Sequence, residues 1–254
     1  MTDHSAFSLE GKRVVVTGAN TGIGQGIALS AIRAGAHVIG VGRSSMAETR
    51  AGADALSGSF SEFSCDLSDR AASMNLIDTL WDQNGPVDGL VNNAGIIRRG
   101  DALDFTAADW DEVMDLNVRS MFFLCQAFGR RLVQAERRGK IVNIASVLSL
   151  QGGIRVASYT ASKHGVLGIT RLLACEWAAR NINVNAIAPG YVTTNNTEAI
   201  RNDPNRSASI LGRIPAGRWG EPQDVGDAAV FLLTPASNYM HGALVPVDGG
   251  WLAR

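Results

Sequence analysis

The sequence predicts an α/β fold in a single domain, with a doubly wound parallel sheet of about seven strands and helices on both faces. Short β-branched runs alternate with longer stretches of helical period along all 254 residues, which is typical of parallel strands joined by helical crossovers. Hydrophobic residues make up 46% of the chain, enough for a large core. No repeat, low-complexity run or linker divides the sequence, so one domain over residues 1–254 is expected.

Seven short runs predict the strands, at 13–18, 37–42, 61–66, 89–95, 140–146, 182–190 and 243–250. Helices are expected between them. The clearest is 159–180, where apolar residues at spacings of three and four predict one buried face, formed by Val166, Ile169, Leu172, Leu173 and Trp177. Right-handed crossovers bring the carboxyl ends of the strands to one edge of the sheet, where ligands of such folds bind.

Charge and composition exclude several classes of partner. The formal net charge of -1 leaves no basic excess for a phosphate backbone, so no nucleic-acid partner is expected. The first residues contain no apolar signal segment, and nowhere do about 18 apolar residues follow one another, so neither export nor a membrane span is expected.

Cysteines and histidines indicate neither disulfides nor a metal site. Cys65, Cys125 and Cys175 are far apart and odd in number, which fits a reducing cytoplasm. The four histidines have no zinc-ligand spacing, so no metal is expected and these residues are interpreted as incidental. They are His4, His37, His164 and His241.

A glycine-rich turn carries the first functional signal. Gly18, Gly22 and Gly24 follow the first strand and precede a helix that begins near Ile23. Glycines there permit a tight turn, so that a pyrophosphate can rest on the N–H groups at the start of the helix. This order predicts a Rossmann-type dinucleotide site, and an ordinary strand-to-helix turn is the alternative. The spacing G-x-x-x-G-x-G differs from the commoner G-x-G-x-x-G.

Several segments share one resemblance: "TGANTGIG" (17–24), "NNAG" (92–95), Asn117, Ser146, "YTASK" (159–163) and "PGYVTT" (189–194). In this order, and over essentially the whole chain, they resemble the short-chain dehydrogenases/reductases. The segments "NNAGIIRR", "QGGIRVASYTASK", "RIPAGRWG" and "VDGGWLAR" are similar to members that interconvert a keto and a hydroxy group on a deoxy-sugar acid. The resemblance implies a nicotinamide-dependent oxidoreductase in the breakdown of unsaturated uronates from pectin-type polysaccharides.

Tyr159 and Lys163 are the expected centre of the chemistry. Reduction of a ketone needs an acid within reach of the developing alkoxide. A phenol has a pKa of about 10, and a nearby ammonium favours its phenolate. Residues four apart share a helix face, so Lys163 can assist Tyr159. Taken alone, the pair would be interpreted as surface residues; the other segments of the resemblance reverse that interpretation.

The resemblance adds Ser146 and Asn117 to the catalytic set. Ser146 ends a predicted strand, where a serine is usually a turn or cap residue; the resemblance makes it a ligand of the substrate oxygen. Asn117 falls within an apparent helix, where it would ordinarily weaken the helix from a solvated face. In the family this asparagine helps to hold a water that links the lysine to solvent.

The resemblance also assigns cofactor contacts. Asn92, Ala94 and Gly95 correspond to the segment beneath the adenine ribose. Asp66 corresponds to the acid near the adenine amino group, or it caps a helix that begins at Ser68. The expected cofactor residues are Gly18, Asn20, Gly22, Ile23, Gly24, Arg43, Asp66, Leu67, Asn92, Ala94, Gly95, Tyr159, Lys163, Pro189, Gly190, Val192 and Thr194.

The choice between NAD(H) and NADP(H) stays open at this point. An acidic residue after the second strand would accept the ribose hydroxyls, but the sequence has Gly42, Arg43 and Ser44 there. Arg43 can pair with a 2′-phosphate, stack on adenine or face water. The resemblance favours NAD, and that gives NAD a slight preference.

A sugar-acid substrate calls for a cation near its carboxylate. Arg98 and Arg99 follow the NNAG segment, and Arg155 precedes the catalytic helix. Arg98 and Arg155 are the assigned candidates, with Arg155 the first choice. The stretch 194–215, with Arg206 and Arg213, is expected to form a substrate lid.

The resemblance implies a homotetramer, with interfaces from 105–135, 159–180 and the C-terminal "GGWLAR". Two alternatives to the sugar-acid function remain open. One is a reductase of another carbonyl compound, such as a 3-oxoacyl thioester or a ketose acid. The other is a non-catalytic module that senses a dinucleotide, because a fold alone does not establish catalysis.

Overall fold

A seven-stranded parallel sheet forms the centre of the protein and confirms the predicted fold, in the strand order β3-β2-β1-β4-β5-β6-β7. The computed structural model describes residues 5–254. The strands are β1 (Arg13–Thr17), β2 (His37–Gly42), β3 (Ser59–Ser64), β4 (Gly89–Asn92), β5 (Gly139–Ile144), β6 (Ile182–Pro189) and β7 (Leu244–Val247).

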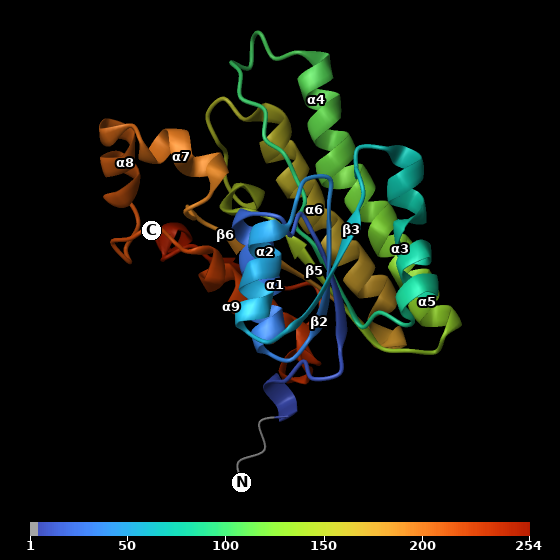
Figure 1. Cartoon of the computed structure of the whole chain (residues 1–254). Helices are drawn as coiled ribbons and strands as arrows, with labels where there is room; N and C mark the ends of the chain where they lie inside the picture. Colours follow the sequence, from blue (N-terminus) through green and yellow to red (C-terminus); the bar gives the residue numbers. More distant parts are fainter. Residues whose placement is uncertain (1–4) are drawn as a thin grey trace.

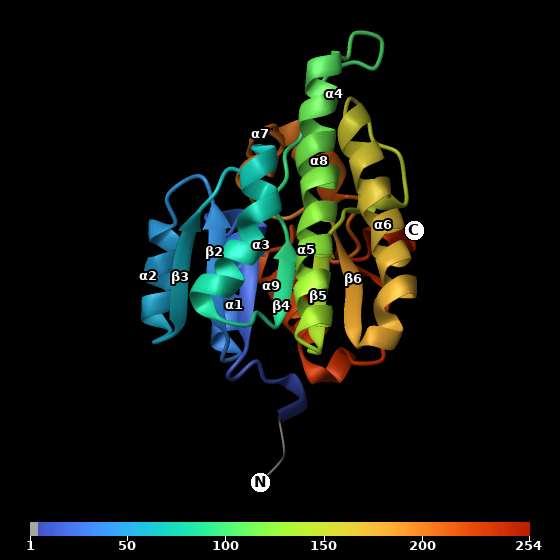
Figure 2. The same ribbon diagram turned by 90° about the vertical axis from the view of Figure 1, so that its right-hand side faces the viewer.

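Helices cover both faces of the sheet. Those of at least one α- or π-helical turn are α1 (Gly22–Arg33), α2 (Ala47–Ala55), α3 (Arg70–Asn84), α4 (Ala107–Met114), η2 (Asp115–Ser120), α5 (Met121–Gln134), α6 (Ala157–Trp177), α7 (Asn195–Arg201), α8 (Pro204–Leu211) and α9 (Pro222–Leu233). Short 3-10 turns are η1 (Ser5–Phe7), η3 (Val147–Ser149), η4 (Ala178–Arg180), η5 (Pro235–Ser237) and η6 (Trp251–Ala253). Helices α3, α5 and α6 lie on one face of the sheet, and α1 and α9 lie on the other (Figures 1 and 2).

The two-residue period of the strands builds two cores. Val15 of β1 packs in the core under α3, α5 and α6, while its neighbours Val14 and Val16 pack in the core under α1 and α9. A strand that is buried on both faces has apolar residues at successive positions, which explains the sequence "VVV" at Val14, Val15 and Val16. A third, smaller core joins α8 to the C-terminal turn through Ile210, Ile214 and Trp251.

The structure shifts several predicted boundaries. The third strand begins at Ser59 and ends at Ser64, so Asp66 lies beyond it. Helix α6 begins at Ala157, two residues before Tyr159. The predicted burial of Leu172 is wrong: this side chain is 49% exposed. Each helical residue turns by about 100°, which carries Leu172 off the face defined by its buried neighbour Leu173.

The long helix expected over 105–135 is divided in the middle. Residues Asp115–Ser120 form a π-helical segment between α4 and α5. Such wide turns are frequent at functional sites, and this one contains Asn117.

No helix within residues 5–254 combines the length and the apolar character needed to cross a membrane.

Candidate active site

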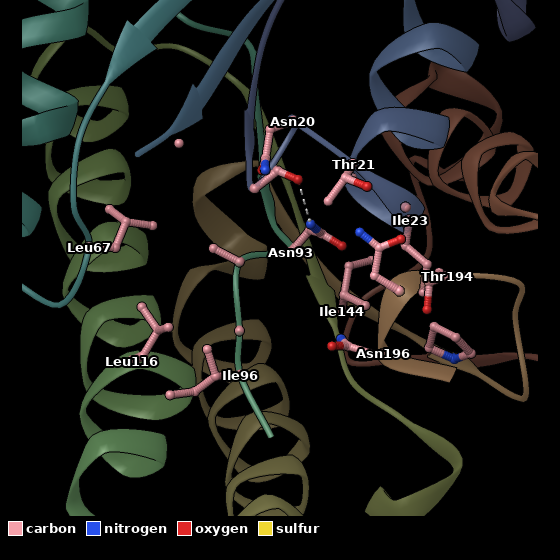
Figure 3. Close-up of a pocket in the computed structure, with 18 of the residues that line it drawn as sticks. Asn20, Thr21, Ile23, Leu67, Asn93, Ile96, Leu116, Ile144, Thr194 and Asn196 are labelled. Carbon is pink, nitrogen blue, oxygen red and sulfur yellow. Dashed lines mark hydrogen bonds between the residues drawn. The ribbon is translucent and has the colours of Figure 1, made fainter. Parts of the chain in front are cut away.

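A cleft with a volume of about 440 Å³ opens at the carboxyl ends of the strands. The order of the sheet reverses between β1 and β4, and ligands of open α/β sheets bind at such a point. Figure 3 shows Leu67, Leu116 and Ile96 along one side of the cleft, with Thr21 and Thr194 on the other. Helices α7 and α8 lie beside the same edge of the sheet (Figure 1).

The glycine turn is shaped by a close approach of backbone to backbone. Gly18 and Gly22 have φ values of +67° and +56°, which favour glycine. A Cβ atom on Gly24 would lie 2.0 Å from the carbonyl oxygen of Gly18. Thr21, the N-cap of α1, makes no side-chain capping hydrogen bond, so the first N–H groups of the helix remain available to an anion. The turn therefore fits a pyrophosphate.

The NNAG segment is fixed to this turn by Asn93 rather than by Asn92. Asn93 donates from Nδ2 to the carbonyl oxygen of Thr17 at 2.9 Å and to that of Gly18 at 3.3 Å, and Figure 3 shows Asn93 beside the glycine turn. Asn92 is buried within the sheet, where its Nδ2 donates to Asn143 at 2.9 Å. Asn93, Ala94 and Gly95 line the cleft and Asn92 does not. The structure thus places the predicted Asn92 away from the cofactor cleft.

Three of the four predicted catalytic side chains line the cleft. Ser146 follows β5 and accepts a hydrogen bond from the Leu148 N–H at 3.1 Å, which fixes the start of η3. Lys163 is buried, and its Nζ donates to the Ile144 carbonyl oxygen at 2.7 Å. The same Nζ lies 5.4 Å from the centroid of the Tyr159 ring. Ser146, Tyr159 and Lys163 therefore share one wall of the cleft.

Burial dominates the proton affinities of these groups. The pKa of Tyr159 is raised by burial, while its contact with the Ser146 hydroxyl and the nearby Arg99 guanidinium act in the opposite direction. Burial lowers the pKa of Lys163 to about 8. The sequence predicts a phenol whose ionisation is favoured by the lysine, whereas in this arrangement desolvation outweighs the favourable charges.

Asn117 lies behind the cleft wall and is buried, not on a solvated face. Its Oδ1 accepts from the Ile96 N–H at 2.9 Å, and its Nδ2 donates to the Ile96 carbonyl at 2.9 Å and to Ser162 Oγ at 3.2 Å. Asn117 therefore connects the NNAG strand end to helix α6, which carries Tyr159 and Lys163.

Arg43 and Asp66 form the end of the cleft after β2 and β3. Arg43 is 70% exposed at its side chain, and its Nη1 lies 3.6 Å from Asp66 Oδ2. Hydrogen bonds from the Ser68 hydroxyl and N–H, followed by the charge of Arg43, lower the pKa of Asp66. Asp66 does not cap a helix, because α3 begins at Arg70 and is capped by Asp69. Leu67 also lines the cleft.

The loop after β6 closes the other end of the cleft. A Cβ on Gly190 would lie 2.7 Å from the Asp248 Cα, so glycine permits a close crossing of two chain segments. Val192 is bridged to Gly220, and Thr194 caps α7. The predicted residues Pro189, Gly190, Val192 and Thr194 all line the cleft.

The structure separates the three arginines considered for the substrate. Arg98 is held by Glu112, at 2.7 and 2.8 Å, and Arg155 is exposed in a left-handed conformation with φ +61°; neither lines the cleft. Arg99 does not line the cleft either. It is exposed and donates to the Asn196 carbonyl at 3.1 Å, and its charge acts to lower the pKa of Tyr159.

Further cleft residues were not singled out by the sequence, because they are ordinary loop or core types. Strand alternation places the side chains of Asn92 and Asn93 on opposite faces, but the face that borders the cleft is known only from the folded sheet. The others are Thr21, Val41, Cys65, Ser68, Ile96, Glu112, Leu116, Ile144, Ala145, Asn195, Asn196 and Thr197.

Of the histidines, His4 lies outside the described residues. His37 forms a hydrogen bond with Ser59, and His164 forms one with the Thr160 carbonyl.

Known proteins match this chain over almost its whole length. Residues 18–252 match the family described as enoyl-(acyl carrier protein) reductase. The 2-dehydro-3-deoxy-D-gluconate 5-dehydrogenase of Escherichia coli is 54% identical over 98% of this chain and 99% of its own. The enzyme of that name from Bacillus subtilis is 50% identical over 99% of this chain and 98% of its own.

A solved structure agrees with these relatives. It comes from Agrobacterium tumefaciens, has bound NADP and is described as a 2-deoxy-D-gluconate 3-dehydrogenase. It is 56% identical, covers 98% of this chain and 99% of its own, and superposes with a TM-score of 0.94. The chain therefore belongs to the short-chain dehydrogenase/reductase family of oxidoreductases.

Proposed function

We propose that this protein transfers a hydride between a nicotinamide cofactor and the keto or hydroxy group of a deoxy-sugar acid, as the relatives named 2-dehydro-3-deoxy-D-gluconate 5-dehydrogenase do. The observation that carries the proposal is that Ser146, Tyr159 and Lys163 line the same cleft as the glycine turn. This arrangement gives a proton donor and a dinucleotide cradle a common space, and it argues against a module that only senses the dinucleotide.

The side chains have distinct proposed roles in that cleft. The bound nicotinamide would supply or accept the hydride. Tyr159 holds the exchangeable proton at its phenol oxygen, and Ser146 orients the substrate oxygen toward it. Lys163 is anchored to the Ile144 carbonyl, which fixes its charge beside the tyrosine. Asn117 holds Ile96 and α6 in register, and we keep it in the catalytic set as a positioning residue.

Arg99 is the cation that we propose for the substrate carboxylate, in place of Arg98 and Arg155. None of the three arginines lines the cleft, and the guanidinium of Arg98 is occupied by Glu112, so the choice depends on which guanidinium acts on Tyr159. Arg99 affects Tyr159 electrostatically and is held by a single backbone contact at Asn196. A guanidinium with free N–H groups can bind a carboxylate with two parallel hydrogen bonds.

Residues 194–215 are proposed as the substrate lid. They form α7, α8 and the turn after them, and Asn195, Asn196 and Thr197 line the cleft. Their base is fastened by Ile210 and Ile214 against Trp251, and Arg213 lies 3.8 Å above the Trp251 ring. Arg213 therefore supports the lid rather than contacting substrate.

For the cofactor, we propose that both NAD and NADP bind and that Arg43 favours NADP. Strand β2 ends in Gly42 and is followed by Arg43 and Ser44, so no carboxylate lies at this strand end to repel a 2′-phosphate. Arg43 is largely exposed at the cleft end, and the relative from Agrobacterium tumefaciens has bound NADP. The NAD preference drawn from the sequence finds no support in these observations.

We also propose a homotetramer. Exposed apolar side chains on α5 and α6, including Val133 at 40% and Leu172 at 49% exposure, would be covered by association of copies. Size-exclusion chromatography with light scattering measures the mass directly, and a monomer would contradict this assembly.

The function is tested by recording absorbance of the reduced nicotinamide. Purified protein is offered 2-dehydro-3-deoxy-D-gluconate with NAD and with NADP, and a 3-oxoacyl thioester and a simple ketose with the reduced cofactors. We expect turnover of the deoxy-keto acid alone. Turnover of the thioester alone would show that the substrate is a 3-oxoacyl compound and not a sugar acid. Binding of the dinucleotide without any turnover would favour the module that only senses the dinucleotide.

A further inference from the structure

A second pocket lies at the edge of the sheet opposite the active site. It is lined by the starts of β1, β4, β5 and β6 and by the turn that follows α9, and its volume is about 280 Å³. That turn is at the end of the molecule away from α7 and α8 (Figure 2). The pocket shares no residue with the active-site cleft.

Positive charge exceeds the negative charge available in this pocket. Its cations are Lys12, Arg138 and Lys140, and its carboxylate is Asp88. Asp88 is already engaged by Arg137 at 3.0 Å, by Lys12 at 3.7 Å and by the Arg13 N–H at 3.1 Å. Within residues 5–254, Arg138 and Lys140 form no ion pair.

Lys140 is the most unusual of these cations. It is half-buried, and its Nζ donates to the Ser237 hydroxyl at 3.3 Å. The Ser237 hydroxyl donates to the Leu232 carbonyl at 2.9 Å. It therefore offers the Lys140 ammonium a neutral acceptor and no counter-charge. Burial without a counter-charge lowers the pKa of Lys140 to about 8. A desolvated ammonium without a carboxylate is costly for the fold.

His241 also lines this pocket, and the positive charge of the pocket affects its pKa. Burial, and then the charge of Lys140, lower the pKa of His241. Its Nδ1 is buried with no hydrogen-bond partner in the described chain, while Nε2 lies 3.2 Å from Asn183 Nδ2. Asn183 already donates both Nδ2 hydrogens, to the carbonyls of Asn238 and Met240 at 2.9 Å each, so the contact with Nε2 assigns no N–H of His241 to the pocket.

We propose that this pocket binds a small anion, either phosphate or a short dicarboxylate, between Lys140 and Arg138. The anion would supply the missing counter-charge for the half-buried ammonium of Lys140 and for the guanidinium of Arg138. A volume of 280 Å³ corresponds to roughly nine water molecules at about 30 Å³ each, which accommodates such an anion and excludes a dinucleotide.

Competitive labelling of lysines tests this site directly. Lys12, Lys140 and Lys163 are the lysines of the chain, so each is resolved by peptide mass spectrometry after brief acetylation near pH 8. The protein is saturated with NADP to fill the active-site cleft. At an anion concentration about ten times Kd, roughly one site in ten stays free, so acetylation of Lys140 should slow about tenfold. Comparing phosphate with malonate identifies the preferred anion.

A matched pair of variants separates the site from a general charge effect. Lys140→Gln and Arg33→Gln each remove one positive charge, and Arg33 lies outside the pocket. The preferred anion should raise the melting temperature of the wild type and of Arg33→Gln but not of Lys140→Gln. Unchanged acetylation of Lys140 with both anions would overturn the proposal; this labelling needs no variant, so it decides the matter even if Lys140→Gln fails to fold.

Discussion

Asn93 and Thr17 join the two strand ends that form the floor of the cleft. The Asn93 Nδ2 donates to the Thr17 carbonyl at 2.9 Å. In return, the Thr17 hydroxyl accepts from the N–H groups of Asn93 at 2.9 Å and Ala94 at 3.0 Å. Because Thr17 is buried, these bonds compete with no water. They fix the glycine turn and the NNAG segment as one unit.

Thr17→Val should therefore destabilise the protein although it conserves shape. The substitution leaves the partly buried N–H groups of Asn93 and Ala94 without an acceptor, and an unsatisfied buried group costs about 1–3 kcal/mol. We expect the free energy of unfolding in urea to fall by roughly 2 kcal/mol or more. Thr79→Val is the matched control, since its hydroxyl bonds only within α3. Equal losses in the two variants would show that Thr17 has no special part in the junction.

Tyr159→Phe should abolish turnover and spare cofactor binding. Removal of the phenol oxygen removes the proposed proton donor, and general acid catalysis contributes about 10²- to 10⁴-fold to rates. Stopped-flow or steady-state absorbance gives kcat, and fluorescence of the bound reduced cofactor gives its Kd. Retention of wild-type kcat in this variant would contradict the proposed role of Tyr159.

Gly24→Ala should weaken dinucleotide binding selectively. The new Cβ would lie 2.0 Å from the Gly18 carbonyl oxygen, so the turn has to move away from α1. Loss of one charge-assisted hydrogen bond, about 1.5–3 kcal/mol, corresponds to a Kd raised roughly tenfold to a hundredfold.

Gly168→Ala is the control for that substitution. Gly168 lies within α6 and has open space around its Cβ position. Alanine there should stabilise the helix by about 0.5–1 kcal/mol and leave cofactor affinity unchanged. An unchanged Kd in Gly24→Ala would mean that the turn does not hold the pyrophosphate.

Arg43→Gln should change the choice of cofactor. If Arg43 pairs with the 2′-phosphate, its loss should raise KM for NADP about tenfold, equivalent to about 1.4 kcal/mol, with little effect on KM for NAD. Arg33→Gln removes the same charge on α1 at a distance from the cleft. A parallel increase in both KM values would indicate that Arg43 stacks on adenine instead.

Stability at acidic pH should depend on Asp224. The Arg218 side chain, followed by the Glu221 N–H, lowers the pKa of Asp224. A carboxyl whose folded pKa is depressed stabilises the fold above its unfolded pKa and loses this contribution as pH falls through the folded value. We expect Asp224→Asn to unfold more easily than wild type at neutral pH, with the difference shrinking below about pH 4. A difference constant with pH in urea titrations would exclude a role for the ionised carboxylate.

The strands and the glycine turn were predictable because each depends on short-range pattern. The apolar run at Val14–Val16 and the glycines that follow it determine their own conformations. The choice among neighbouring polar residues was not predictable, because it depends on which face a side chain takes. Asn92 turns into the sheet and Asn93 toward the cleft.

The arginines show a second limit. Nothing in the local sequence distinguishes Arg98 from Arg99; Glu112, on a helix that follows later in the chain, holds Arg98. The π-helical segment likewise leaves no signature in an amphipathic pattern, so Asn117 was assigned from resemblance and its burial emerged only from the structure.

The π-helical segment at Asp115–Ser120 also acts as a rotational offset. A π-helical turn takes up one more residue than an α-helical turn, so every later side chain lies about 100° behind the position that an uninterrupted α-helix of the same sequence would give it. Helix α4 can thereby pack against α6 while α5 packs against α3. Conversion of Asp115–Ser120 to regular α-helix with all its residues kept would turn the apolar stripe of α5, with Leu124 and Phe128, away from the sheet. Deletion of one residue within the segment would instead restore a regular helix and keep that stripe in place, so chimeras with an uninterrupted helix should fold only when the segment is one residue shorter.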